Sequence, residues 1–174
     1  MALHPVRGMD HIGITVADMA SATDFLIRAF GAEIIYDSVT ATDDDLQGEE
    51  NDRLLNLAPG TRISAVRLLR LQHGPGIELF EMHGAQQRAP VRPSDYGLQH
   101  FAVYVADMSA ATEKFVAAGG TLFTPPRALS FRTETGADNA FCYGRAPWGS
   151  VIELITYPTP MPYEQHTTLR RWRP

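Results

Sequence analysis

Several features that would identify whole classes of protein are scarce or absent in this sequence. It has one cysteine, Cys142, which excludes an internal disulfide and is typical of a reducing compartment. No apolar run approaches the roughly 20 residues that span a bilayer, and the opening MALHPVRGMD lacks the apolar core of a signal peptide. The basic ending RRWRP (residues 170–174) is too short to mark a nucleic-acid interface. We therefore expect a cytoplasmic protein that binds neither a membrane nor nucleic acid.

Length and composition are those of an ordinary globular protein. The chain has 174 residues, of which 44% are hydrophobic and 20% charged, and its formal net charge is -5. This length predicts one domain, or two small halves that share a core, with enough chain to bury a sizeable apolar interior.

One stretch of the chain occurs twice. Residues 8–19 read GMDHIGITVADM and residues 97–108 read GLQHFAVYVADM, so Gly, His and Val-Ala-Asp-Met recur at the same offsets. The similarity continues through ASATDFLIRAFGA in the first copy and SAATEKFVAAGGT in the second. An internal repeat of this kind predicts two structurally equivalent halves.

Each copy has the pattern of a strand followed by a helix. Residues 10–16 alternate as a strand does, Asp18 is suited to cap a helix, and Gly31 is suited to end one. Asp107 and the pair at residues 119–120 have the same roles in the second copy. Apolar stripes at helical spacing lie between them: Ala22, Leu26, Ala29 and Phe30, then Met108, Ala111, Phe115 and Ala118.

Strand-like segments follow each predicted helix, so the order β-α-β-β-β occurs twice. The segments are residues 33–39, 63–71 and 77–82 in the first half, and residues 122–123 (a weak signal), 140–143 and 151–157 in the second. Residues 42–60 indicate a loop with one short helix. The predicted divisions are a first module at 1–84, a linker at 85–96, a second module at 97–157 and a tail at 158–174.

The repeated histidines and two glutamates share a strand face with small or apolar neighbours. Successive strand side chains point to opposite faces, so His11 lies beside Gly13, away from the helix. His100 is placed in the same way. The last strand of each half contributes a glutamate, Glu78 in GIELFEM and Glu153 in VIELITYP. A carboxylate among apolar residues, as at Glu153, costs several kcal/mol unless it is paired or binds a metal. Two histidines and two glutamates make a four-ligand set suited to a divalent first-row metal.

The chain resembles the vicinal oxygen chelate superfamily, which includes glyoxalases, methylmalonyl-CoA epimerases, extradiol dioxygenases and fosfomycin-resistance proteins. The resemblance covers nearly the whole chain and is carried by HIGITVADM (11–19), IELFE (77–81), HFAVYVADM (100–108) and WGSVIEL (148–154). Ala146 stands where the family's turn before the last motif has an aspartate, which we expect to be a change at a surface turn that leaves the ligand unaffected.

The resemblance implies an α+β fold in which two βαβββ modules form a curved mixed sheet around a metal cleft. The implied ligands are His11, Glu78, His100 and Glu153, and the implied cofactor is a divalent ion, with Zn, Ni, Co, Mn and Fe not distinguished. The substrate would be a small molecule with vicinal oxygens, and we expect a homodimer.

The preferred function is a metal-dependent enzyme that moves a proton on a carbon adjacent to a carbonyl through a metal-stabilised enolate. Glu153, and second Glu78, would be the base. The products would be those of an epimerase or isomerase, or of a glyoxalase-type lyase. The acidic insertion and the tail are similar to those of cyclitol epimerases in the superfamily and favour the first. An extradiol-type dioxygenase is an alternative, although a fourth ligand at Glu78 would crowd its iron. A metal-independent binding or resistance protein is another.

Other reactive side chains have simpler interpretations. Alternation places Glu81 on the helix-packing face, and we expect a surface carboxylate at the strand end. Cys142 is expected to be a small packing residue. Arg67 is a possible substrate clamp, although alternation does not place it inside. The pair at residues 170–171 is either a solvated surface feature or closes over an anionic substrate.

Overall fold

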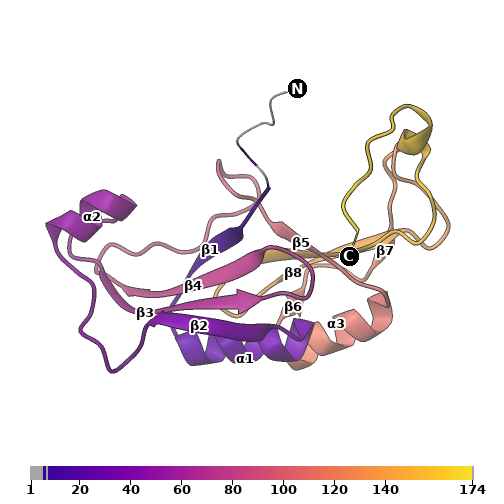
Figure 1. The fold of residues 1–174 in the computed structure, drawn as a ribbon. Coiled ribbons are helices and arrows are strands. Elements are labelled where there is room, and N and C mark those ends of the chain that lie inside the picture. Colours follow the sequence, from indigo (N-terminus) through magenta and orange to yellow (C-terminus); the bar gives the residue numbers. More distant parts are fainter. Residues whose placement is uncertain (1–5, 7, 174) are drawn as a thin grey trace. The chain divides into compact units, whose positions relative to one another are not determined.

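The computed structural model describes residue 6 and residues 8–173 (Figure 1). The outer ends of the predicted first module and tail therefore lie outside the described residues. The chain forms two compact units, residues 1–23 with 31–87, and residues 24–30 with 88–174. Helix α1 (Met19–Phe30) belongs to both, its start to the first unit and its remainder to the second. No helix in the described part is long and apolar enough to cross a membrane.

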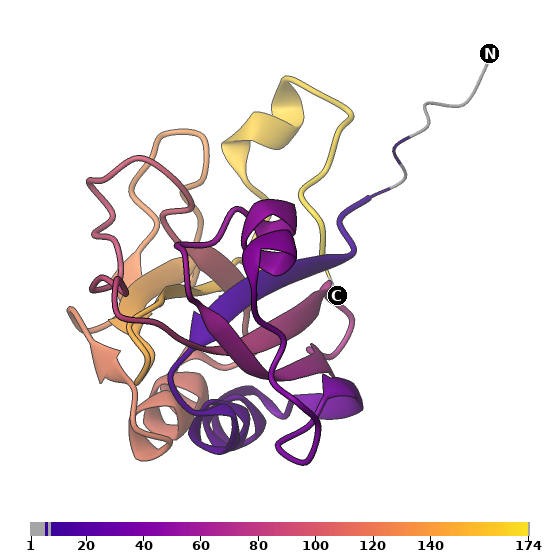
Figure 2. The same ribbon diagram turned by 90° about the vertical axis from the view of Figure 1, so that its left-hand side faces the viewer.

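The first unit contains a mixed four-stranded sheet. Its strands are β1 (His11–Val16), β2 (Glu33–Val39), β3 (Arg62–Arg70) and β4 (Gly76–His83), in the order β1-β4-β3-β2. β1 and β4 are parallel, and the other pairs are antiparallel. The predicted loop contains α2 (Glu49–Leu55), which lies on the side of the sheet opposite the start of α1 (Figure 2).

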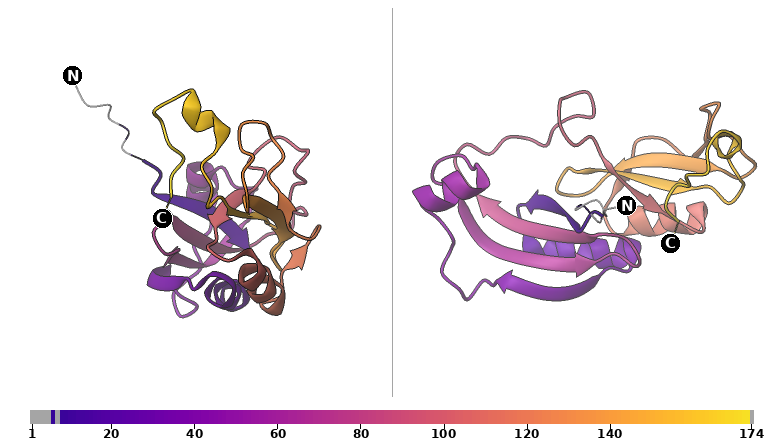
Figure 3. Two further views of the ribbon diagram at one scale, coloured as in Figure 1. Left: turned by 90° about the vertical axis from the view of Figure 1, so that its right-hand side faces the viewer. Right: turned by 45° about the horizontal axis from the view of Figure 1, so that its top comes forward.

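The second unit repeats this plan with shorter strands. Its elements are β5 (Phe101–Tyr104), α3 (Met108–Ala117), β6 (Thr121–Leu122), β7 (Arg127–Ala128), β8 (Ala140–Arg145), β9 (Val151–Thr156) and the 3-10 helix η1 (Pro162–Gln165). The strand order is β5-β9-β8-β6, with β7 also paired to β8, and β5 is again parallel to its neighbour β9. Helix α3 and the tail lie on opposite sides of this sheet (Figure 3). The α+β class and the repeated order are confirmed; β7, two residues long, is too short for alternation to reveal.

Each sheet buries one face beneath helical side chains. In the first unit, Ile77 and Leu79 of β4 are fully buried, as predicted. In the second unit, Phe115 of α3 packs so closely on the sheet that a Cβ added at Gly144 would lie 2.6 Å from its ring. Phe25, from the second half of α1, meets the Phe115 ring edge-to-face at 5.4 Å. Such aromatic pairs contribute about 0.5–1.5 kcal/mol beyond their burial.

The predicted helix signals are present in the structure. Asp18 accepts a hydrogen bond from the Ser21 N–H at 2.7 Å, and Asp107 caps α3 in the same way at 3.0 Å. Gly31, just after α1, has φ of 67°, a left-handed conformation that glycine adopts without strain. These local signals fix where each strand ends and its helix begins.

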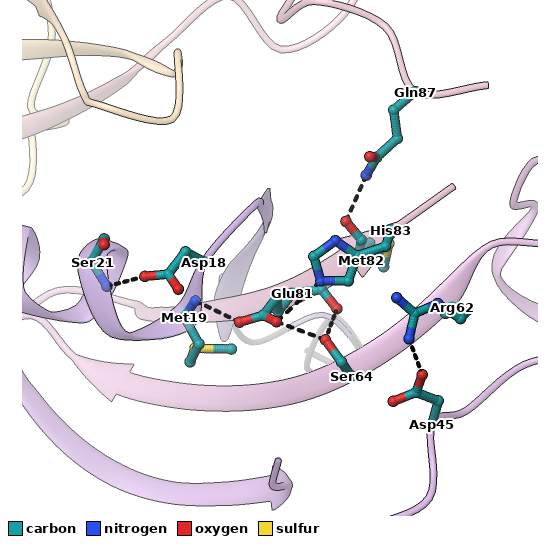
Figure 4. Close-up of polar contacts among 10 residues, drawn as sticks. All are labelled: Asp18, Met19, Ser21, Asp45, Arg62, Ser64, Glu81, Met82, His83 and Gln87. Carbon is teal, nitrogen blue, oxygen red and sulfur yellow. Dashed lines mark hydrogen bonds and ion pairs between the residues drawn. The ribbon is translucent and has the colours of Figure 1, made fainter. Parts of the chain in front are cut away.

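Glu81 supports the start of α1, and the expectation of a surface carboxylate at this position is wrong. Its carboxylate accepts hydrogen bonds from the Met19 N–H at 2.7 Å and the Ser64 hydroxyl at 2.8 Å, and contacts His83 Nε2 at 3.1 Å (Figure 4). The β1–β4 register places Val16, three residues before Met19, opposite Glu81. The helix therefore begins directly over this side chain. Burial alone would raise the Glu81 pKa, but these hydrogen bonds lower it.

We predict that Glu81→Gln reduces the free energy of unfolding by about 1–3 kcal/mol at pH 7, because a partly buried charge-assisted hydrogen-bond network is broken. A carboxyl whose pKa is lower in the folded state stabilises the fold above its unfolded pKa and loses that effect as pH falls through the folded value. The difference from the parent should therefore shrink as urea unfolding is repeated from pH 7 towards pH 3.

Glu33→Gln is the matched control, since Glu33 lies on edge strand β2, is exposed and, among the described residues, forms an ion pair with Arg70 of β3 alone. It should change stability by less than about 0.5 kcal/mol. Metal content should not change in either variant. A Glu81→Gln protein as stable as this control would contradict the capping role.

Candidate active site

The first unit holds a histidine–carboxylate pair on the sheet face opposite α1. His11 begins β1, and Glu78 lies in β4, where the parallel register places it across from Gly13. His11 Nε2 lies 3.2 Å from Glu78 Oε2. His11 Nδ1 lies 2.7 Å from Asp10 Oδ2. The hydrogen bond with Asp10 raises the pKa of His11, burial lowers it, and Glu78 raises it further.

The second unit holds the equivalent pair. His100 Nε2 lies 3.1 Å from Glu153 Oε2, and the β5–β9 register places Glu153 across from Ala102. His100 Nδ1 lies 2.9 Å from Gln99 Oε1. The repeat seen in the sequence is therefore also a repeat of side-chain contacts.

Both histidines are oriented by the residue before them. Asp10 and Gln99 each present a side-chain oxygen to the Nδ1 atom of the next residue. In the neutral tautomer that binds a metal, Nδ1 would donate its proton to that oxygen and Nε2 would offer its lone pair to the ion. Metal-binding histidines are commonly held by such contacts at the other ring nitrogen. Sequence reasoning missed Asp10 and Gln99, although both directly precede the repeated histidine.

Glu153 has the more enclosed setting of the two glutamates. Its side chain is 10% exposed, against 23% for Glu78. Burial raises the pKa of the Glu153 carboxyl, His100 and Arg171 lower it, and Glu134 raises it; the net direction is upward. An ionised carboxylate here thus depends on its charged neighbours.

Tyr143 completes the surroundings of Glu153 and was also missed from the sequence. It lies across from Glu153 in the β8–β9 register, and its ring centroid is 5.0 Å from that of His100. Burial and the Glu153 charge raise the pKa of its hydroxyl. Alternation within β8 points to Tyr143 once the register is known, but the sequence does not supply the register.

Each unit by itself offers one nitrogen and one oxygen ligand. Among the described residues, no group of three or more His, Cys, Asp or Glu side chains is gathered around a position that could hold an ion. The ligand chemistry nevertheless fits a divalent first-row metal, because the Nε2 atoms and carboxylate oxygens are of the types such ions prefer. That all four residues bind one ion stays a prediction.

Two other reactive residues have structural roles. Arg67 binds Asp37 through two contacts of 2.6 and 3.0 Å and also contacts Thr23 at 3.1 Å. Its guanidinium is thus engaged within the first unit. Cys142 is 1% exposed, and its Sγ atom lies 3.9 Å from Met108 Sδ of α3. It packs on the helix side of the sheet, and burial raises the pKa of its thiol to about 11.

Comparison with known proteins places the chain in a family. The model of the Glyoxalase/Bleomycin resistance protein/Dioxygenase superfamily matches residues 10–143. The chain is also 33% identical over 166 residues to a 2-epi-5-epi-valiolone epimerase of Actinomyces sp., and the match covers 94% of this chain and 87% of the relative. The chain therefore belongs to this superfamily, which is that of the vicinal oxygen chelate proteins.

Solved structures with low sequence identity share the fold. A glyoxalase family protein from Bacillus cereus has a TM-score of 0.66 at 18% identity, covering 90% of this chain and 97% of that one. A mutant fosfomycin resistance protein from Listeria monocytogenes, in complex with Mn(II) and 1S,2S-dihydroxypropylphosphonic acid, has a TM-score of 0.56 at 18% identity, covering 93% and 99%.

We predict that Cys142 resists alkylation in the folded protein. A thiol with a pKa of about 11 is protonated near pH 8 and is also shielded from reagent. Iodoacetamide at pH 8, followed by intact-mass measurement, should leave the native chain unmodified and label the urea-unfolded chain once. Rapid labelling of the native chain would contradict the packing role and reopen a nucleophilic one.

Proposed function

We propose that this chain is a divalent-metal-dependent epimerase or isomerase that moves a proton on a carbon adjacent to a carbonyl. The observation that carries the proposal is the repeated pair, His11 with Glu78 and His100 with Glu153. In each pair the histidine Nε2 lies 3.1–3.2 Å from a glutamate oxygen, and Nδ1 contacts a side-chain oxygen of the preceding residue. The relative of 33% identity named as an epimerase supports this choice over a glyoxalase-type lyase.

We propose that these four side chains bind one ion. Its ligand set would be two neutral imidazole nitrogens and two carboxylate oxygens, which leaves room for substrate oxygens in an expanded coordination sphere. The Mn(II) complex of the fold neighbour from Listeria monocytogenes is consistent with a divalent ion in this fold. When bound, such an ion acts as a Lewis acid that lowers the energy of negative charge on the carbonyl oxygen.

We assign Glu153 as the base, a role that it would take once substrate oxygens replace it among the ligands of the ion. It is the less exposed glutamate, and both faces of β9 are otherwise apolar around it. A carboxylate in such surroundings is a stronger base than a solvated one, because water does not stabilise its charge. His100 and Tyr143 border it and would keep its orientation while it takes the proton from one face of the carbon. Glu78, in the more open pair, would act chiefly as a ligand.

We propose a small polyhydroxylated cyclic ketone as the substrate. The name of the epimerase relative supports this class. Carbonyl and hydroxyl oxygens on adjacent carbons would supply the vicinal oxygens that the site is expected to bind. The homodimer and cytoplasmic location expected from the sequence stay predictions.

We predict that about one divalent ion per chain binds, as one first-row ion satisfies a four-ligand set. His11→Ala and His100→Ala should each weaken binding, and the double variant should abolish it. Metal analysis after dialysis against each candidate ion provides the measurement. His73→Ala, in the exposed turn between β3 and β4, is the control and should bind as the parent does. Two ions per chain, with each single variant losing one, would contradict a shared site.

We predict that Glu153→Gln slows deuterium exchange at the substrate carbon by roughly 10²–10⁴-fold, the usual share of a general base. The amide keeps the shape of the side chain and an oxygen, so the fold and most metal binding should persist. Glu78→Gln is the matched comparison and should weaken metal binding but retain exchange when metal is saturating. Proton NMR in D₂O follows the exchange.

The reverse ranking would make Glu78 the base and Glu153 only a ligand. If the parent exchanges a proton on no ketone but consumes oxygen with a catechol and Fe(II), the proton-transfer function is wrong. A dioxygenase would then replace it.

A further inference from the structure

The C-terminal segment of residues 169–173, here called the strap, lies on the same face of the second sheet as Glu153. Ile155 and Tyr157 follow Glu153 at two-residue steps and so point to its side of β9. The Tyr157 hydroxyl donates to the Trp172 carbonyl at 2.6 Å, and Arg173 Nη2 donates to the Tyr157 carbonyl at 2.9 Å. Figure 1 shows the chain returning to this sheet after η1.

Two arginines of the strap contact the ring of Tyr157. The guanidinium carbons of Arg171 and Arg173 lie 4.8 and 5.0 Å from the centroid of the Tyr157 ring. Tyr157 is itself buried against Ile155 and Met161. Cation–π contacts of this kind contribute about 0.5–2 kcal/mol each, and together they fix the position of Arg171.

Arg171 makes two further contacts, with Glu134 and Tyr163. Its Nη1 lies 3.2 Å from Glu134 Oε1, and its backbone N–H donates to the Tyr163 hydroxyl at 2.9 Å. The charges of Arg171 and Glu134 both act on Glu153. A guanidinium has five N–H donors, and the described residues engage one of them, through Glu134.

Aromatic rings line the face between Glu153 and the strap. Tyr104 meets Tyr157 edge-to-face at 4.8 Å, and Phe141 meets Tyr143 in the same way at 5.7 Å. All but Tyr157 are only partly buried. A ring with apolar C–H faces and hydroxyl edges matches such a surface, since its faces pack on the aromatics and its edge bonds to polar groups.

We infer that Arg171 is a specificity-determining residue that binds ring hydroxyl groups of the substrate while the reacting carbon lies at Glu153. This inference rests on the proposed function and adds the recognition element to it. The ion pair with Glu134 compensates the arginine charge, which favours neutral hydroxyl groups over a phosphate or carboxylate. Arg171 touches substrate but takes no part in the proton transfer.

The test compares two ketones. One is 2-epi-5-epi-valiolone, the compound named for the relative, and the other is 2-hydroxycyclohexanone, which keeps the vicinal oxygens and lacks the remaining hydroxyls. Arg171→Met retains a side chain that packs on Tyr157 but removes the donors. We expect KM for the first ketone to rise about 10- to 100-fold, the usual effect of losing hydrogen bonds to a charged group. Because the charge of Arg171 also acts on Glu153, kcat should fall to the same extent for both ketones, whereas KM for the second ketone should be unaffected.

Arg170→Met is the matched control. Arg170 is paired with Glu164 at 3.3 Å and donates to the carbonyls of Thr167 and Leu169, so its contacts lie within the tail. It should leave KM for both ketones unchanged. Arg171→Lys keeps the charge without the planar fork and should give an intermediate KM for the first ketone. It serves in place of Arg171→Met should the latter unfold, as judged by thermal denaturation.

An equal rise in KM for both ketones, or an unchanged KM for the first, would overturn the inference while leaving the proton-transfer function in place. A parent enzyme that exchanges neither ketone would instead overturn the proposed function, and the inference with it. Tighter binding of a phosphorylated ketone that is lost in Arg171→Met would replace hydroxyl recognition by anion recognition.

Discussion

Side chains along β1, β4, β5 and β9 alternate between the two faces of their sheets. One face packs against a helix, and the other carries the histidine–glutamate pairs. In β4, Ile77 and Leu79 are buried towards the helix, and Glu78 between them points the other way. In β9, Ile152 and Leu154 enclose Glu153 in the same manner. A slip of one residue in either strand would bury a glutamate under a helix and expose the core. The burial of the aliphatic residues therefore also positions the carboxylates.

Parallel pairing of the first and last strand in each unit supplies the second constraint. It sets Glu78 across from Gly13 and Glu153 across from Ala102, two places after the histidine in each case. Small residues at these positions leave the histidine Nε2 and the carboxylate free to meet. Local alternation and the repeat were enough to predict which residues share a face. The contacts of Glu81 with Met19 and of Tyr143 with Glu153 depend on register between distant segments, so the sequence alone could not supply them.

The two pairs differ in their surroundings although their geometry is the same. The His11 side chain is 41% exposed and neighbours a charged Asp10, whereas His100 is 23% exposed and neighbours an uncharged Gln99. The difference arises from what covers each sheet face. In the second unit, Tyr143 and the aromatic cluster around Tyr157 exclude water near Glu153. A duplicated ligand pair in unequal surroundings supports unequal roles, with the drier carboxylate suited to accept a proton and the wetter one to remain a ligand.

Substrate recognition would then depend on a segment without regular structure, and proton transfer would depend on a β-strand. The proposed proton acceptor lies in the middle of a strand, where hydrogen-bonded neighbours on both sides fix it. Arg171 lies on a segment without regular structure, which tolerates sequence change more readily than a strand does. Such a segment positions a side chain well only when it is anchored, and Tyr157 provides that anchor through its ring, hydroxyl and carbonyl. Because Tyr157 continues the same alternation as Glu153, the strand that holds the proposed base also fixes the residue proposed to select its substrate.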